Sequence, residues 1–415
     1  MMTTRPVQDV APRRPVAAPP ARPVRGSRSG LLEIAMVGTR GVPAAYGGFE
    51  TAVEEVGRRL VERGHRVTVY SRRAEQRVRE HLGMRVVHLP ALHQKQLETL
   101  SHTGLSALHL VTRHRPDAAF VFNAANSPLL GVLRARRVPV ALHMDGLEWR
   151  RSKWGPRGQA YYLRAEEHGV RTADALIADA PGIADYYRHQ FDVPTELIRY
   201  GAPILEDVAA APLVELGLEA GRYHVVVARF EPENHVREIV EGYHRSDARL
   251  PLVVVGSAPY SAGYTQAIQR AAETDQRIRL LGAVYDQDVL DALYTHAATY
   301  VHGHSVGGTN PSLLRAMGAG TPVISYDVGF NRETLDGDAW FFTGAEDLPA
   351  ALHEAEADAE VTARRGARHR DRAREAFRWE DVATAYEDLA RRLAAGESVH
   401  PRARRARRRV EEWPG

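Results

Sequence analysis

The 415-residue chain is 44% hydrophobic and 26% charged, a composition typical of a globular protein long enough for two domains. It contains no cysteine, which excludes disulfides and thiolate metal sites. Its net charge of +3 is uneven, because residues 1–30 carry +5 and residues 401–415 carry +4, leaving −6 for the rest. Since the basic residues gather at the two ends and not on a folded face, we do not expect nucleic-acid binding.

Residues 1–30 are rich in Pro, Ala and Arg and show no hydrophobic periodicity, so we expect a disordered basic tail. They lack the apolar core of a signal peptide, and no apolar run in the chain approaches the ~20 residues of a membrane span. These features predict a cytoplasmic protein.

A glycine-rich turn, residues 38–48, follows the first apolar run, which starts at Leu31. Apolar residues at helical spacing then predict a helix from Gly48 to before Gly64, and His65–Ser71 a second strand. This βαβ opening lacks the spacing G-x-G-x-x-G and an acidic residue after the second strand. A nicotinamide-dependent oxidoreductase is therefore only a weakly supported alternative.

Further αβ units follow, and polar residues stand where their strands end. We expect strands at 85–89, 118–123, 138–143 and 173–178, and helices at 94–114 and 127–134. His143 and Asp145 come at the end of the third of these strands, where parallel sheets bind ligands, so both are candidates for a cleft. The alternative is a plain turn at Asp145 with a hydrogen-bonded histidine before it.

A second αβ domain is predicted after a linker around residues 203–221, which has little apolar periodicity. Arg229 directly follows its first strand, residues 223–228. The run Asp286-Gln287-Asp288 spells the D-x-D of metal-dependent transferases, but it opens a helical pattern, where Asp is favoured for capping. We interpret it as a cap.

The stretch Thr299–Ser325 reads as strand, glycine loop, helix, turn and strand. Gly307 and Gly308 lie in the loop, Asn310 is a candidate N-cap, and Pro311 suits the first helical position. A strand that leads through a glycine loop to a helix N-terminus is an anion site, since bare N–H groups and the positive helix end face the ligand. The alternative is a tight turn that needs glycine for its shape alone.

Several motifs, taken together and in order over residues 31–395, carry a family resemblance. The run SVGGTNPSLL in the glycine loop is the most specific, followed by DGLEW with the basic, Trp-containing residues 150–154. The others are Gly47-Gly48-Phe49-Glu50, Arg229 to Asn234, and Asp327 to Glu333. The chain resembles the retaining glycosyltransferases of the GT-B, family 4 type, and most of all their rhamnosyltransferase-like bacterial subgroup.

This resemblance implies a GT-B fold, in which two Rossmann-like domains with parallel sheets face each other across a cleft. The domains would span residues 31–203 and 222–378, with a helix at 379–396 crossing back to the first and a second basic, disordered tail at 397–415. The implied reaction moves a sugar, with rhamnose as a candidate, from a dTDP-, UDP- or GDP-linked donor to a hydroxyl, with retention. Neither a metal nor another cofactor is expected.

The resemblance also implies site residues. Asp145 and Arg229 would be catalytic. The donor would be bound by Gly47, Gly48, His143, Arg229, Asn234, Gly307, Gly308, Thr309, Asn310, Arg315 and Glu333, and the acceptor would lie near Arg40, Tyr46 and Glu50.

Three positions depart from the wider family. Gly307 and Arg315 stand where that family has glutamates, and Asn234 stands where it has a lysine that grips the diphosphate. We expect Arg315 to restore the missing positive charge, because a diphosphate needs cationic or N–H partners. The same departures leave a sugar-nucleotide-binding pseudoenzyme as an alternative.

The acceptor is expected to be a glycan or a lipid-linked sugar. Six arginines in residues 401–415, with the basic N-terminal residues, predict weak and salt-sensitive contact with an anionic membrane surface. The alternative is a tail without a partner.

Overall fold

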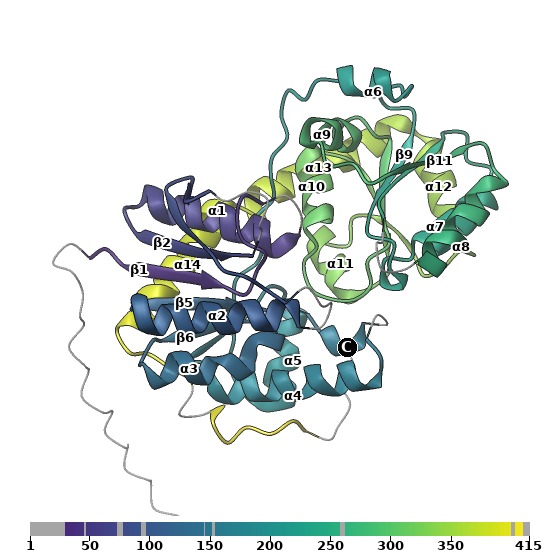
Figure 1. Cartoon of the computed structure of the whole chain (residues 1–415). Helices are drawn as coiled ribbons and strands as arrows, with labels where there is room; N and C mark the ends of the chain where they lie inside the picture. The colour runs from purple at the N-terminus through teal and green to yellow at the C-terminus, as the bar shows by residue number, and fades with distance from the viewer. Residues whose placement is uncertain are drawn as a thin grey trace, which may run out of the picture.

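The computed structural model describes residues 30–44, 47–72, 78–92, 97–144, 146–151, 154–257, 262–399 and 403–409. Tyr46, Asp145, Arg402 and the N-terminal tail up to residue 29 lie outside the described residues. Figure 1 shows two α/β domains side by side, each with helices on both faces of a sheet.

The first domain has an eight-stranded sheet in the order β3-β4-β2-β1-β5-β6-β7-β8. All pairings are parallel except β3 with β4, a short hairpin at the edge. The inner strands β5, β6 and β7 are buried along their whole length, as parallel strands covered on both faces must be. The strands are β1 (Glu33–Val37), β2 (Arg66–Ser71), β3 (Glu80–His81), β4 (Met84–His88), β5 (Ala118–Phe122), β6 (Val140–His143), β7 (Ala175–Ala178) and β8 (Glu196–Leu197).

The helices of this domain include two that the sequence pattern did not predict, α4 and α5, and the buried face of α4 mixes Glu166 and Gly169 with apolar residues. The helix expected at 127–134 begins earlier, as a 3-10 turn that contains Pro128. The helices are α1 (Gly48–Glu62), α2 (Glu98–Arg113), α3 (Leu130–Ala135), α4 (Pro156–Thr172) and α5 (Pro181–Phe191), with 3-10 turns η1 (Ala124–Leu129) and η2 (Glu148–Arg150).

The second domain has a fully parallel six-stranded sheet in the order β11-β10-β9-β12-β13-β14. Its strands are β9 (His224–Val227), β10 (Leu252–Val255), β11 (Ile278–Gly282), β12 (Thr299–His302), β13 (Val323–Tyr326) and β14 (Trp340–Phe342). Its helices are η3 (Pro232–Asn234), α7 (Val236–His244), α8 (Ala262–Glu273), α9 (Gln287–Thr295), α10 (Pro311–Ala319), α11 (Gly329–Leu335), α12 (Leu348–Ala357) and α13 (Ala359–Ala376). The predicted pair of Rossmann-like domains is therefore confirmed.

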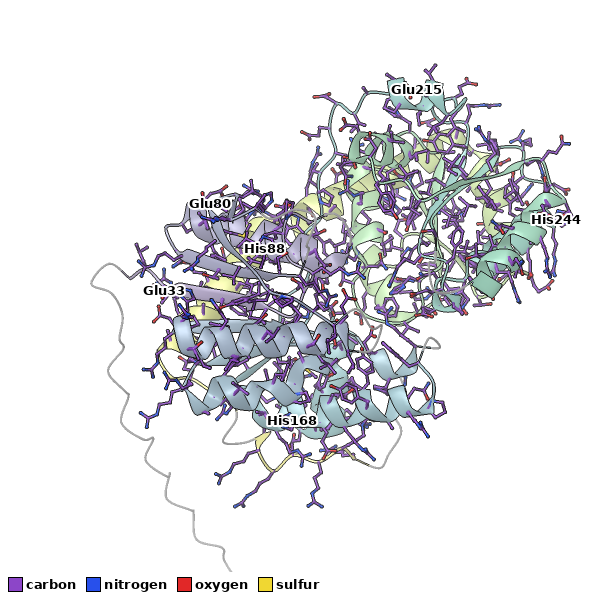
Figure 2. All side chains as sticks on the ribbon, viewed as in Figure 1. Glu33, Glu80, His88, His168, Glu215 and His244 are labelled. Atoms are coloured by element: carbon purple, nitrogen blue, oxygen red, sulfur yellow. The ribbon has the colours of Figure 1, made fainter. Side chains whose placement is uncertain are left out.

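The chain crosses between the domains twice. The first crossing leads into the short helix α6 (Ala211–Glu215), and Figure 2 shows its Glu215 at the outer edge of the second domain. The second crossing leads into α14 (Trp379–Ala394), which packs on α1 and β5 of the first domain. The two crossings touch, because the Ala202 amide donates to the Phe377 carbonyl at 2.7 Å.

The end of the chain is not a disordered tail over the described residues. Residues 403–409, here called the C-terminal strap, lie along the first domain (Figure 1). Ala403 is fully buried, and the Arg409 amide donates to the Gln190 carbonyl at 2.9 Å. Composition predicted disorder because the segment has few apolar residues, yet it is held by backbone hydrogen bonds and by contacts with ring faces.

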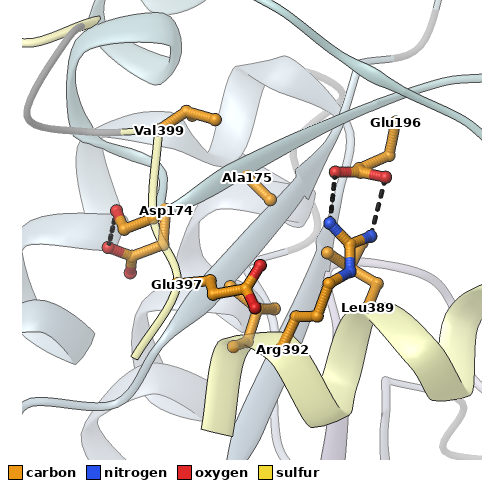
Figure 3. Close-up of a pocket in the computed structure, with 9 residues that line it drawn as sticks. Asp174, Ala175, Glu196, Leu389, Arg392, Glu397 and Val399 are labelled. Atoms are coloured by element: carbon orange, nitrogen blue, oxygen red, sulfur yellow. Dashed lines mark hydrogen bonds and ion pairs between the residues drawn. The ribbon is translucent and has the colours of Figure 1, made fainter. Parts of the chain in front are cut away.

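A cavity of about 360 Å³ lies where α14 ends and the chain turns toward the strap (Figure 3). On one side Arg392 makes two hydrogen bonds to Glu196, at 2.9 and 2.8 Å. On the other, the hydroxyl of Ser398 donates to Asp174 at 2.7 Å. These polar contacts attach the chain end to β7 and β8. Within the described part of the chain, none of the helices is long and apolar enough to cross a membrane.

Candidate active site between the two domains

The N-termini of two helices, one from each domain, meet at the domain boundary. α1 begins at Gly48 and α10 at Pro311, and a Cβ built on Gly48 would lie 2.8 Å from Pro311 Cγ. Figure 1 shows α1 and α10 on the facing sides of the two domains. Each helix N-terminus carries a partial positive charge, and the two ends meet at the same boundary. The pair of termini favours an anion between the domains.

The glycine loop that precedes α10 has the local structure that the sequence predicts. The Asn310 side chain caps the helix by accepting a hydrogen bond from the Ser312 amide at 2.8 Å, and Pro311 takes the first helical position. Gly320 closes the helix in the left-handed conformation. Gly307 has φ +134°, a conformation that other residues rarely adopt.

Two loops of the first domain lie directly against this glycine loop. A Cβ on Gly146 would overlap the backbone of Gly307, and a Cβ on Gly308 would overlap the carboxylate of Asp179. The Thr309 hydroxyl also donates to the Asp179 carbonyl at 3.0 Å. The glycines therefore serve close approach between the domains as well as loop shape.

The glycine turn of the first domain is held by Glu50. Its carboxylate accepts the Arg40 amide at 2.8 Å, and Glu50 is buried. Gly47 has φ +110°, and a Cβ there would overlap this carboxylate. The geometry gives Glu50 a role in fixing the turn, while the side chain of Arg40 is exposed. Tyr46, the third predicted acceptor-side residue, lies outside the described residues.

Arg229 follows β9, and its side chain is 41% exposed and 3.5 Å from Glu231. Its backbone carbonyl accepts a hydrogen bond from the Asn234 carboxamide at 2.8 Å. The Asn234 oxygen in turn lies 2.8 Å from Nδ1 of His304. Burial, and then Arg151 and other nearby cations, hold the pKa of His304 well below its usual value, so this imidazole is neutral. Asn234 thus braces the Arg229 loop and supplies no charge.

A buried ion cluster joins the domains beside the glycine loop. Arg151 is 7% exposed and pairs with Glu148 on its own loop and with Glu233 of the second domain at 3.7 Å. Both carboxylates are also buried. Sequence reasoning missed Arg151, Glu233 and Asp179 as individual site residues. Asp179 follows the buried strand β7, so the strand-end rule that selected His143 would also have selected it.

His143 ends β6 and is buried beside Phe49 at the start of α1. Its ring is 2% exposed and packs among Phe49, Phe122 and Tyr200, with centroids 5.1, 5.6 and 6.0 Å away. Burial lowers the pKa of His143 to about 3, so the side chain is neutral. Asp145, the predicted catalytic carboxylate two residues on, lies outside the described residues.

Arg315 does not take the expected role in this geometry. It pairs with Asp291 of α9, and both side chains are largely buried. We expected Arg315 to supply the positive charge that is missing at Asn234. The sequence did not reveal its pairing with Asp291, because Asp291 belongs to another helix. Glu333, on α11, lies across from the start of α5, and partial burial raises the pKa of its carboxyl. Its Oε1 lies 3.9 Å from a Cβ built on Gly182.

The D-x-D run is a helix cap, as the sequence pattern predicts. Asp286 accepts hydrogen bonds from the amides of Asp288 and Val289 at 2.9 and 3.3 Å. Among the described residues, no group of three or more His, Cys, Asp or Glu side chains is placed to hold a metal ion.

Both domains match families of known proteins. Residues 47–201 match the family "Glycosyl transferase 4-like domain", and residues 221–358 match the family "Glycosyl transferases group 1". The chain belongs to the GT-B glycosyltransferases. In curated sequences, the chain is 27% identical to the O-antigen chain mannosyltransferase B of Escherichia coli over 132 residues, which is 31% of this chain. The match spans about a third of that relative, 34% of its length.

Solved structures show the same fold over most of this glycosyltransferase. Sucrose-phosphate synthase from Thermosynechococcus elongatus aligns with a TM-score of 0.76 and 22% identity, over 88% of this chain and 99% of that one. Anabaena HepE in complex with UDP-glucose aligns with a TM-score of 0.69 and 14% identity, over 86% of this chain and 99% of that one. The catalytic domain of starch synthase IV from Arabidopsis thaliana, bound to ADP and acarbose, aligns with a TM-score of 0.69 and 15% identity, over 88% of this chain and 100% of that one.

Proposed function

We propose that the protein transfers a sugar from a nucleotide-sugar donor to a hydroxyl of a glycan or lipid-linked acceptor, with retention and without a metal ion. The observation that carries the proposal is the meeting of the α1 and α10 N-termini at Gly48 and Pro311, with the exposed Arg229 on the same side of the second domain. A diphosphate is an anion that such helix ends bind. The UDP-glucose complex of the distant structural relative HepE supports a nucleotide-sugar donor.

Catalysis would rest on positioning and electrostatics. As the bond from the sugar to the diphosphate breaks, negative charge grows on the leaving phosphate, and fixed N–H groups and Arg229 stabilise it. The close approach of Gly146 to Gly307 would hold the loop after β6 against the glycine loop and so fix the position of the two domains during transfer. Asp145 is proposed as the carboxylate nearest the transferred sugar.

A panel of dTDP-, UDP- and GDP-sugars, including dTDP-rhamnose, tests the donor. A ligand that binds only the folded state raises the melting temperature, so one base and sugar should stand out. Transfer is then measured with that donor and glycan or lipid-linked acceptors, in the presence and absence of a chelator. The configuration of the product, determined by NMR, tests retention. If no sugar nucleotide raises the melting temperature, the donor proposal fails.

A sugar-nucleotide-binding pseudoenzyme is the second candidate. It is favoured by glycine at 307, where the wider family has a carboxylate, and by the engagement of Arg315 with Asp291. Such a protein would bind a donor but neither transfer nor hydrolyse its sugar. We further propose a cytoplasmic location with weak contact to anionic membranes, which vesicle binding tests in the Discussion.

A further inference from the structure

The C-terminal strap inserts one arginine into the first domain. Arg408 donates from Nη2 to Glu166 Oε1 at 3.0 Å and also contacts the hydroxyl of Tyr186. Its guanidinium carbon lies 5.1 Å from the centre of the Trp149 ring and 5.7 Å from that of Tyr186, within the range of cation–π attraction. The neighbouring Arg405, by contrast, is exposed.

Glu166 gives this contact an energetic reason. It lies on α4 and is 3% exposed, and burial raises the pKa of its carboxyl to about 8, a rise that Arg408 opposes. A buried carboxylate without a cation is strongly unfavourable, so removing one partner of such a pair costs more than the pair contributes. The strap therefore supplies the cation that favours the charged form of this carboxyl, against the burial that favours its neutral form.

Trp149 connects the strap to the interdomain site. It is the middle residue of η2, which packs on α4. Glu148, the first residue of this short turn, and Arg151, the residue directly after it, form the buried cluster with Glu233 of the second domain. Gly146, at the start of the same loop, touches Gly307. The loop therefore contacts the second domain through Gly146 and Arg151, while Arg408 of the strap packs on its tryptophan.

We propose that Arg408 is a positioning residue for transfer: by holding Trp149 against α4 and α5, it fixes loop 146–151, and with it Glu148 and Arg151, at the domain boundary. This inference rests on the proposed glycosyl transfer for its kinetic consequence, but the placement of the loop is testable without any activity.

The first experiment measures hydrogen–deuterium exchange of the full-length protein. Arg408→Met should raise exchange about 10-fold in the peptide that covers residues 146–151 and leave α12 unchanged. Arg405→Met, which removes an exposed charge from the same strap, is the matched control and should behave like the parent. Equal exchange in the Arg408 variant and the parent would overturn the proposal.

The second experiment measures kinetics with the donor found in the panel. Arg408→Met should lower kcat about 10-fold or more and change the dissociation constant of the donor less than 3-fold, because Arg408 contacts Glu166 and Trp149 and not the residues proposed to bind the donor. Millimolar methylguanidinium should restore part of the lost kcat in this variant and have no effect on Arg405→Met. A loss of donor binding with unchanged kcat, or equal losses in both variants, would contradict positioning.

If Arg408→Met alone does not fold, the double variant Arg408→Met with Glu166→Gln replaces the buried carboxyl that has lost its cation by a neutral amide. It should fold and still show the raised exchange at 146–151. A double variant with parental exchange would overturn the inference. A parent that transfers no sugar while its exchange pattern follows these expectations would refute the proposed function and leave the strap contact intact.

Discussion

The backbone of Gly146 lies directly against that of Gly307, so that no side chain fits between loop 146–151 and the glycine loop. Gly308 lies equally close to the carboxylate of Asp179, so that a Cβ on Gly308 would overlap it. Because these contacts join two domains and do not fill either core, changes here should affect the approach of the domains more than their folding.

Gly308→Ala should therefore lower kcat at least 10-fold, since a displacement of about 1 Å between reacting groups can cost 10²-fold in rate. Its melting temperature should stay within about 2 °C of the parent. Gly131→Ala is the control, because a Cβ at Gly131 meets no atom within 4 Å. Full activity of Gly308→Ala would mean that the domains need not approach this closely.

Arg229→Ala should weaken donor binding by about 2 kcal/mol, or ~30-fold, as expected for the loss of a charge-assisted hydrogen bond. Because the Arg229 side chain is 41% exposed and is screened by solvent, we expect a loss of binding free energy at the lower end of the range for charge-assisted hydrogen bonds. Arg229→Lys should recover only part of the affinity, because the planar fork is lost. Calorimetry with the selected donor measures both variants, and unchanged affinity in the alanine variant would remove Arg229 from the site.

Arg315→Glu should destabilise the second domain by about 1–3 kcal/mol, because a new carboxylate would face Asp291 in a largely buried setting. Adding Asp291→Arg should restore most of the stability by reversing the pair. Chemical denaturation measures both variants. If instead Arg315→Glu keeps its stability and loses donor affinity, Arg315 serves the phosphates as the sequence comparison suggested.

Acid should destabilise the protein through its buried histidines. Burial lowers the pKa of His302 to about 3, so between pH 3 and the ordinary value of 6.5 the unfolded chain binds a proton that the folded one does not. Stability therefore rises with pH across this window and is lost as pH falls below about 6.5, by up to ~1.4 kcal/mol per pH unit for each such group. His302→Gln should show a smaller difference between unfolding free energies at pH 7.5 and 5.0. The exposed His353→Gln should match the parent.

Contact with anionic vesicles is expected to depend on the exposed arginines of the strap. Full-length protein should sediment with anionic vesicles at low salt and be released at high salt. The triple change of Arg404, Arg405 and Arg407 to Gln should weaken sedimentation while keeping Arg408 in place, which truncation would not. Equal binding of the triple variant, or equal binding to neutral vesicles, would refute an electrostatic anchor.

The features that were predictable from sequence are local. The cap at Asn310 and the proline at 311 lie within three residues of the helix start that they define. The alternation of strand and helix patterns along the chain predicted a parallel sheet in each domain. The Asp286 cap is local in the same sense.

The features that were missed depend on distant partners. Asp291 meets Arg315 only because α9 packs on α10, and Arg408 reaches Glu166 across 242 positions of sequence. An arginine-rich composition normally indicates a disordered, solvated segment. Here the strap is ordered, because the guanidinium of Arg408 packs against aromatic rings and a buried carboxyl group. Helix α4 was missed because polar residues interrupt its buried face.

The two crossings between the domains restrict how the site can open. The Ala202 amide is hydrogen-bonded to the Phe377 carbonyl, and a Cβ on Gly201 would overlap the Trp379 ring, so the two connections behave as one narrow hinge. Two linkers held together leave a single axis of rotation and resist sliding or twisting. Separation at the Gly146–Gly307 contact would then be a swing through an arc, which would open the site on the side opposite the hinge.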